Sequence, residues 1–351
     1  MTEETSPCTV GVAMSGGVDS TVAAAILLEQ GFTVHGFFMQ LPLPGIEEQI
    51  HKVQQVADSL NIPLHVVDMK EEFRKRVIAS FTDSYCQGRT PNPCIVCNRE
   101  IKFGLLTKAM LAQGMDKTAT GHYAGVHQVN GTALLRRGKD PTKDQSYFLC
   151  RLSPTQLQHS LFPLADYCKK DIFLRAQDFG FTQFGGNESQ DVCFLVHQDL
   201  AAFLAQQGLK SMRGEIATED GRVLGCHDGI WKYTVGQRRG LGIPDATPWY
   251  VIGLDAKNNR VIIGKNDALF QKELLLADMQ WQLELPIPWQ GKVQIRSRHQ
   301  AAEAEVSPVE NGSKNGTWRV RFQEPQRAVT PGQFAVLYQD DMVVGSGIIA
   351  S

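Results

Sequence analysis

The sequence predicts an α/β protein with a doubly wound parallel sheet in residues 1–204. A small β-rich domain (205–275) and a C-terminal β-barrel (276–351) are expected to follow. Short β-branched runs alternate with helical stretches at the start, which is typical of βαβ units. Gly-rich hairpin signals dominate after about residue 210, and closely spaced strand-like runs fill the remainder. At 351 residues the chain exceeds twice the usual domain size of ~150, so several domains are expected.

The elements of the first domain follow from apolar runs and their spacing. Strands are predicted, as short apolar runs, at residues 9–14, 32–39, 63–69 and 117–124. Helices are predicted between them at residues 21–30, 46–61 and 70–85. In such a sheet, ligands bind at the carboxyl ends of the strands.

The later domains are predicted from turn signals. E-D-G and K-N-N in RGEIATEDGRVLG and WYVIGLDAKNNRVIIG separate alternating runs, as in hairpins. VQIRSRHQ, TWRVRFQEPQRAV and FAVLYQDDMVVGSGII then follow at the spacing of strands in a small barrel or sandwich.

Composition and charge exclude several classes of protein. Hydrophobic residues make up 42% and charged residues 21%, which excludes wholesale disorder. The net charge of −2 argues against nucleic-acid binding by bulk charge. No apolar run approaches the ~20 residues that span a bilayer, and the acidic start lacks the pattern of a signal peptide. We therefore expect a cytoplasmic protein without membrane contact.

The strongest local signal is a glycine-rich turn between the first strand and the first helix, from Ser15 to Ser20 (SGGVDS). Adjacent glycines allow a tight turn, and the N–H groups at a helix start attract anions. It is not a Walker A loop, because Gly-Lys-Ser/Thr is missing. The loop therefore predicts a phosphate site, and a plain strand–helix connection is the alternative.

The eight cysteines are too sparse for a disulfide-stapled secreted scaffold. Cys94 and Cys97 form a CxxC that has three interpretations. A zinc half-site needs a second Cys/His pair, which the scattered cysteines do not supply, and a thioredoxin-like site does not suit the flanking sequence. In the third interpretation one cysteine works with a distant partner. Cys193 in SQDVCF is a candidate, although it could equally be a small buried residue.

The motifs resemble those of a known family. AMSGGVDS is similar to the pyrophosphate loop (PP-loop) of the N-type ATP pyrophosphatases, which have an adenine nucleotide alpha hydrolase-like fold and adenylate a substrate oxygen. TPNPxxxCNxxIKF, TGHYA, KDQSYFL, SQDVCF and GCHDGIWKYTVGQRRGLGI occur in the order found in tRNA-specific 2-thiouridylases. Together these motifs cover most of the chain.

The resemblance implies an enzyme, a tRNA-uridine 2-sulfurtransferase, that uses ATP and Mg²⁺. Its implied reaction adenylates the C2 oxygen of the wobble uridine (position 34) of tRNA and replaces it with sulfur, releasing AMP and pyrophosphate. No metal site built from protein side chains is implied. The implied ATP-binding residues are Ala13, Met14, Ser15, Gly16, Gly17, Val18, Asp19, Ser20, Met39 and Gly121.

The resemblance also implies the sulfur chemistry. Cys193 would carry a persulfide received from a sulfur-donor protein, either a cysteine desulfurase or a sulfur-relay carrier, and Cys97 would be the nucleophile that assists transfer. We expect both sulfurs to ionise readily near neutral pH. A thiolate releases sulfur from a persulfide by forming a disulfide, so Cys97 and Cys193 are expected to pair in one alternate state.

The implied tRNA-binding residues, which would hold the anticodon stem-loop and its flipped base, are Asn92, Pro93, Cys94, His122, Lys143, Asp144, Gln145, Arg298, His299 and Gln333. The family often has Asp where this chain has Cys94, which leaves the role of that residue open. Two alternatives remain: an ATP pyrophosphatase that forms amides, and a non-enzymatic tRNA- or metal-binding protein with zinc at the CxxC.

Overall fold

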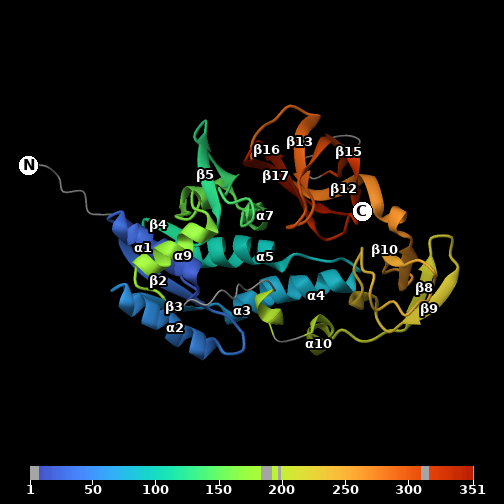
Figure 1. Ribbon diagram of the computed structural model, residues 1–351, viewed down its shortest axis with the longest axis horizontal. Coiled ribbons are helices and arrows are strands. Elements are labelled where there is room, and N and C mark those ends of the chain that lie inside the picture. Colours follow the sequence, from blue (N-terminus) through green and yellow to red (C-terminus); the bar gives the residue numbers. More distant parts are fainter. Residues whose placement is uncertain (1–7, 183–191, 197–198, 310–315, 351) are drawn as a thin grey trace, which may run out of the picture. The chain divides into compact units, whose positions relative to one another are not determined.

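The structure is a computed structural model that describes residues 8–182, 192–196, 199–309 and 316–350. The described chain forms two compact units. The first takes the residues up to Val77, Cys94–Phe194 and Asp341–Val343, and the second takes Ile78–Pro93, Leu195–Asp340 and the residues from Val344. Figure 1 labels the helices and strands of both units.

The first unit is built on a five-stranded sheet in the order β3-β2-β1-β4-β7, with every pairing parallel. The strands are β1 (Thr9–Ala13), β2 (Thr33–Gln40), β3 (Leu64–Asp68), β4 (Lys117–Thr120) and β7 (Ser160–Leu161). The chain runs outward from β1 to β3 and then returns to the other side of β1 at β4. The strand order therefore reverses between β1 and β4, and ligands of open α/β sheets bind at such a point.

Helices cover both faces of this sheet, as the sequence predicts. Val10 and Val12 of β1 belong to a core cluster that includes residues of α1 (Val18–Glu29), α2 (Ile46–Ser59) and α9 (Lys169–Asp178). Gly11, which points to the opposite face, lies against Met110 of α6 (Thr107–Ala112).

Two helices contain π-helical segments that the sequence does not reveal. The predicted helix over 70–85 is a run of α3 (Lys70–Phe73), η1 (Arg74–Ile78) and α4 (Ala79–Cys86), where η1 is π-helical. A second continuous helix consists of α5 (Pro93–Val96), the π-helix η2 (Cys97–Leu106) and α6. The other helical elements of this region are short. They are α7 (Ser146–Leu149), α8 (Pro154–Gln158) and the 3₁₀ turn η3 (Cys193–Leu195).

The predicted strand over 117–124 is wrong at its end. β4 stops at Thr120, and a separate hairpin follows, formed by β5 (Ala124–Val129) and β6 (Thr132–Arg137). The intervening residues are needed at the carboxyl edge of the sheet, where Gly121 meets the phosphate loop.

The second unit contains the predicted β-rich region and barrel. Its helical elements are α4, α10 (Leu200–Gln206) and two 3₁₀ turns, η4 (Ile230–Lys232) and η5 (Asn266–Leu269). Its other regular elements, within the described residues, are strands. A four-stranded sheet has the order β10-β11-β8-β9, formed by β8 (Gly214–Thr218), β9 (Val223–His227), β10 (Tyr250–Asp255) and β11 (Arg260–Gly264).

A closed antiparallel barrel follows in the order β12-β15-β14-β13-β16-β17, with β17 pairing back to β12. Its strands are β12 (Phe270–Trp281), β13 (Trp289–Gln294), β14 (Ala302–Pro308), β15 (Trp318–Arg327), β16 (Phe334–Gln339) and β17 (Met342–Ile349). The predicted fold class is confirmed, and the boundaries at 204 and 275 stay predictions. Across the described residues, the helices are too short or too polar to traverse a bilayer.

Candidate active site

The glycine-rich loop connects the end of β1 to α1. Gly16 adopts a positive φ of 74°, a conformation that favours glycine because a Cβ would strain it. Gly17 is the N-cap residue of α1 and has no side chain that could bond the first N–H groups of the helix. These donors and the positive end of the helix dipole therefore face the loop, as an anion site requires.

The hydroxyl of Ser20 braces the loop from inside. The backbone N–H of Ser15 donates to Ser20 Oγ at 3.1 Å, and Ser20 Oγ donates to the Gly17 carbonyl at 3.1 Å. Gln49 of α2 also donates to the Ser15 carbonyl. The loop is thus held in its turn by its own serines and by one neighbouring helix.

The carboxylate of Asp19 has partners that lie far from it in the sequence. Lys169 Nζ lies 2.8 Å from both carboxylate oxygens, and the Tyr123 hydroxyl donates to Oδ1 at 2.7 Å. The Lys169 side chain is buried, and Asp140 fixes the start of α9 by accepting the Lys169 backbone N–H at 3.0 Å. No local signal could have revealed this pair, since 150 residues separate its members.

Gly121 lies against the same loop. A Cβ added there would be 2.6 Å from the Asp19 carbonyl carbon and 2.7 Å from the Ser20 nitrogen. Met39 lies near the carboxyl end of β2, next to β1 in the sheet. The predicted ATP-binding residues are therefore gathered along one edge of the sheet, where its strand order reverses.

The predicted sulfur residues also meet. Cys97 is the first residue of η2, Cys94 precedes it in α5, and Cys193 opens η3. The charge of Cys193 affects the pKa of Cys97, and that of Cys94 affects both, so the three thiols share one environment. All eight cysteines, each within the described residues, are free thiols, and the Cys97–Cys193 disulfide stays a prediction. Ser189–Asp191 of the SQDVCF motif lie outside the described residues.

Burial determines the protonation of these thiols. It raises the pKa of Cys97 to about 12 and that of Cys193 to about 11, and it also raises the pKa of Cys94. Part of the Cys193 side chain is solvent-exposed, yet the surrounding protein still raises its pKa. The expectation that both sulfurs ionise readily is therefore wrong for this state, because their surroundings disfavour a negative charge.

Lys102 is the cation of the thiol cluster. Its positive charge opposes the effect of burial by lowering the pKa of each of the three cysteines. It also lowers the pKa of His122, which burial already holds well below its ordinary value, so His122 is neutral. His122 Nδ1 lies 2.8 Å from the Thr120 hydroxyl, at the end of β4. The IKF sequence contains Lys102, but a lysine in a helix is ordinarily assigned to the surface.

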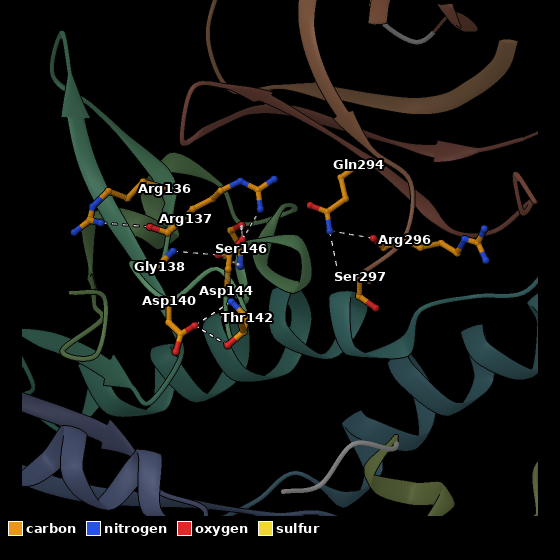
Figure 2. Close-up of polar contacts among 10 residues, drawn as sticks. All are labelled: Arg136, Arg137, Gly138, Asp140, Thr142, Asp144, Ser146, Gln294, Arg296 and Ser297. Atoms are coloured by element: carbon orange, nitrogen blue, oxygen red, sulfur yellow. Dashed lines mark hydrogen bonds and ion pairs between the residues drawn. The ribbon is translucent and has the colours of Figure 1, made fainter. Parts of the chain in front are cut away.

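Among the predicted tRNA-binding residues of the first unit, Asp144 is part of an internal network (Figure 2). Its carboxylate accepts from Arg137 Nη1 at 2.6 Å and from the Ser146 hydroxyl at 2.8 Å. It also accepts from the backbone N–H groups of Gly138 and Ser146. Asp144 therefore holds the turn between β6 and α7 together.

Gln145 and Lys143 lie in the same turn. The Gln145 side-chain oxygen accepts from the Tyr123 backbone N–H at 2.9 Å, and the Gln145 N–H donates to the Tyr123 carbonyl at 2.9 Å. Lys143 is half-buried, and its backbone N–H donates to the Asp140 carbonyl. The turn thus connects the predicted tRNA residues to Tyr123, which contacts Asp19.

In the second unit, Gln333 Nε2 donates to the Thr90 carbonyl at 2.8 Å, in the turn that leads to half-buried Asn92 and buried Pro93. Arg298 is exposed. His299 Nε2 lies 2.8 Å from Gln326 Oε1, and burial lowers the pKa of His299. Gln294 Nε2 donates to the carbonyls of Arg296 and Ser297, which holds the turn that leads to Arg298 and His299 (Figure 2).

Three family models match consecutive parts of the chain. The tRNA methyl transferase HUP domain matches residues 8–197, the tRNA methyl transferase PRC-barrel domain matches 201–265, and the aminomethyltransferase beta-barrel domain matches 271–349. The tRNA-specific 2-thiouridylase MnmA of Desulfotalea psychrophila is 50% identical over 342 residues, covering 97% of this chain and 98% of that protein. The chain belongs to the tRNA-specific 2-thiouridylase family. A 2-thiouridylase of the same name from Magnetococcus marinus is 43% identical, covering 98% of this chain and 99% of that protein.

A solved 4-thiouridine synthetase–RNA complex with bound ATP shares 19% identity with this chain and has a TM-score of 0.35, covering 57% of this chain and 50% of that one. Family membership confirms the resemblance drawn from the motifs. The 2-thiouridylase relatives match nearly end to end, so the similarity extends over the regions of the loop, the cysteines and the barrel.

Proposed function

We propose that this protein adenylates the C2 oxygen of the wobble uridine (position 34) of tRNA and replaces that oxygen with sulfur from a cysteine persulfide. AMP and pyrophosphate are the other products. The chain is an enzyme of the tRNA sulfurtransferase class, and its relatives are named for 2-thiolation of tRNA. The cytoplasm, where thiols remain reduced, suits this chemistry.

The adenylation half is supported by the loop between β1 and α1. The exposed backbone at Gly17 and the start of α1 suit the phosphates of ATP. The carboxylate of Asp19 and the nearby serine hydroxyls are oxygen donors of the kind that Mg²⁺ prefers, and Asp19 would hold the ion beside the phosphates. When bound, Mg²⁺ supplies positive charge that offsets the charge of the triphosphate. The C2 oxygen attacks the α-phosphate and pyrophosphate leaves.

The observation that carries the sulfur half is that the Cys193 thiol, from a distant part of the chain, is near enough to Cys97 to contribute to its raised pKa. The terminal sulfur of a persulfide on Cys193 attacks C2, and AMP leaves with the oxygen. The Cys97 thiolate then attacks the Cys193 sulfur and breaks its bond to the transferred sulfur. The products are 2-thiouridine and a Cys97–Cys193 disulfide, which a thiol reductant reopens.

The tRNA contacts proposed for the residues named above follow from the same family match. A base must leave its stack before its C2 atom is accessible, so a pocket and flanking backbone contacts are needed. Asp144 and Gln145 would act there by holding the turn that carries Lys143, since their own polar groups are bonded within the protein. A protein that carries a persulfide is the proposed sulfur donor.

Nucleoside mass spectrometry tests the proposal. tRNA is incubated with the protein, ATP, Mg²⁺ and a persulfide source, and then digested. We expect 2-thiouridine at position 34, and its loss in Cys97→Ser and Cys193→Ser while ATP binding persists. Cys226→Ser, a change at an exposed free thiol, is the matched control and stays active. AMP release without thiolated tRNA would favour the amide-forming alternative, and full activity in either serine variant would contradict the sulfur chemistry.

A further inference from the structure

The π-helix η2 is unusual in its length. It spans Cys97–Leu106, ten residues, whereas most π-helical segments are single turns inserted in α-helices. It also begins at a proposed catalytic cysteine. Such segments are often found at functional sites.

Gly104 is one feature that permits the winding. A Cβ added there would lie 2.8 Å from the carbonyl oxygen of Arg99, five residues earlier. Real Cβ atoms essentially never come this close to another atom. Only glycine fits without movement of the helix backbone, so the π-helical path depends on the missing side chain.

Gln156 is the second feature. Its side-chain amide donates to the Arg99 carbonyl at 2.8 Å and to the Phe103 carbonyl at 3.1 Å. The Gln156 side chain is itself fixed by the capping box of α8, where its oxygen accepts from the Ser153 backbone N–H at 2.9 Å. Two carbonyls of η2 therefore have partners outside their own helix.

The winding changes which residues share a face. In an α-helix, a residue five positions along lies about 140° around the axis, on another face. In a π-helix the i→i+5 hydrogen bond joins residues that lie a little more than one turn apart, so the two residues share a face. Lys102 is the fifth residue after Cys97. The π-helical path therefore brings the lysine to the face of the cysteine.

Among the described residues, Lys102 is the cation that lowers the pKa of Cys97. Within the described residues, Lys102 has no carboxylate within ion-pair distance. Glu100, on the same helix, pairs with Arg76 and Arg99 at 3.3 Å each, and Glu72 of α3 also pairs with Arg76. The other groups that influence Cys97 are the thiols of Cys94 and Cys193.

We propose that Lys102 is the counter-ion of the sulfur anions in this site, and that the π-helical winding of η2 turns it toward Cys97. When a thiol ionises, its proton passes to solvent and the lysine ammonium keeps its own protons. The purpose of the anion, sulfur transfer, rests on the proposed function. The ionisation itself does not, and it can be measured without tRNA.

Alkylation with iodoacetamide across a pH series tests the proposal, because only the thiolate reacts. Peptide mass spectrometry follows Cys97 and Cys193 separately, with exposed Cys226 as an internal reference. In Lys102→Gln we expect alkylation of Cys97 about tenfold slower at pH 8, the effect of one pKa unit, and a smaller slowing at Cys193. Lys102→Arg should react as the wild type does. Lys108→Met, a change of an exposed lysine on α6, is the control.

Lys102→Met, which keeps the apolar stem, repeats the measurement if the glutamine variant folds poorly. Equal rates at Cys97 in the wild type and in both neutral variants would overturn the proposal. Gly104→Ala keeps the lysine and disturbs the winding through the contact of its Cβ with the Arg99 carbonyl, so it should slow Cys97 in the same direction, and an unchanged rate would refute the role of the π-helix. Thiolation assays run in parallel report on the proposed function, whose failure would leave the alkylation result intact.

Discussion

Replacing Gly121 with alanine tests whether the phosphate loop depends on its contact with the end of β4. The added Cβ would lie 2.6 Å from the carbonyl carbon of Asp19, 2.7 Å from the nitrogen of Ser20 and 2.8 Å from the carbonyl oxygen of Asp19. All three are backbone atoms, which cannot rotate away as a side chain can. Gly121 does not have a positive φ, so the effect is steric and not conformational.

The size of the effect follows from the contact distances. Ordinary contacts of a Cβ begin at 3.4 Å and the closest contact here would be 2.6 Å, so the loop must retreat by roughly 0.8 Å. A displacement of about 1 Å in catalytic groups costs on the order of a hundredfold in rate. Overpacking of this kind also lowers the free energy of unfolding by about 1–3 kcal/mol.

The assay separates the two effects. ATP affinity is measured by equilibrium dialysis, AMP release by chromatography and the free energy of unfolding by urea titration. The control is Gly253→Ala in β10, where the nearest atom to the added Cβ would be 3.7 Å away. We expect the control to bind ATP as the wild type does and Gly121→Ala to lose AMP release about a hundredfold. Wild-type affinity and rate in Gly121→Ala would refute the placement of ATP at this loop.

Three further predictions concern groups around the two half-sites. Lys169→Met should lower AMP release at least tenfold because Asp19 loses its cation, whereas Lys169→Arg should lower it less. Equal rates of AMP release in Lys169→Met and the wild type would contradict a role for the charge. Gln156→Leu should lower the free energy of unfolding by about 1–3 kcal/mol in urea and slow Cys97 alkylation, because backbone carbonyls lose donors; an unchanged midpoint would refute this. The ring of His122 should stay neutral from pH 6 to 8, because burial lowers its pKa, so its NMR shifts should not titrate there.

The βαβ part of the fold was predictable because its signals are local. Each strand of the parallel sheet is a short apolar run. Gly16 and Gly17 mark the turn between β1 and α1, where the chain reverses direction and the phosphate site is expected. The edge of the sheet that holds the ATP-binding residues then follows from strand order alone. The limits of elements were less predictable: α1 begins at Val18, three residues before the predicted start, since a glycine N-cap carries no polar side chain to signal it.

The π-helix η2 could not be predicted from its apolar residues, because so short a segment holds too few of them to define a period. Its buried apolar residues are Ile101, Phe103 and Leu106. Two features decide the winding. One is the side chain of Gln156, which is distant in the sequence, and the other is Gly104, whose role depends on the Arg99 carbonyl five residues earlier. Pairs such as Asp19 with Lys169 escape sequence reasoning for the same reason, since tertiary contacts leave no local pattern.

The two half-sites use lysine in opposite ways. Lys169 is already neutralised by Asp19 at 2.8 Å, so a divalent cation that takes the carboxylate would release a positive charge beside the phosphate loop. Lys102 has no carboxylate partner within the described residues, and the thiols around it are held protonated by burial. Burial raises the pKa of Cys97 far above neutral pH, so this thiol is protonated at pH 7. The resting site therefore keeps its sulfur neutral, which also protects it from oxidation, because the thiolate is the form that oxidises.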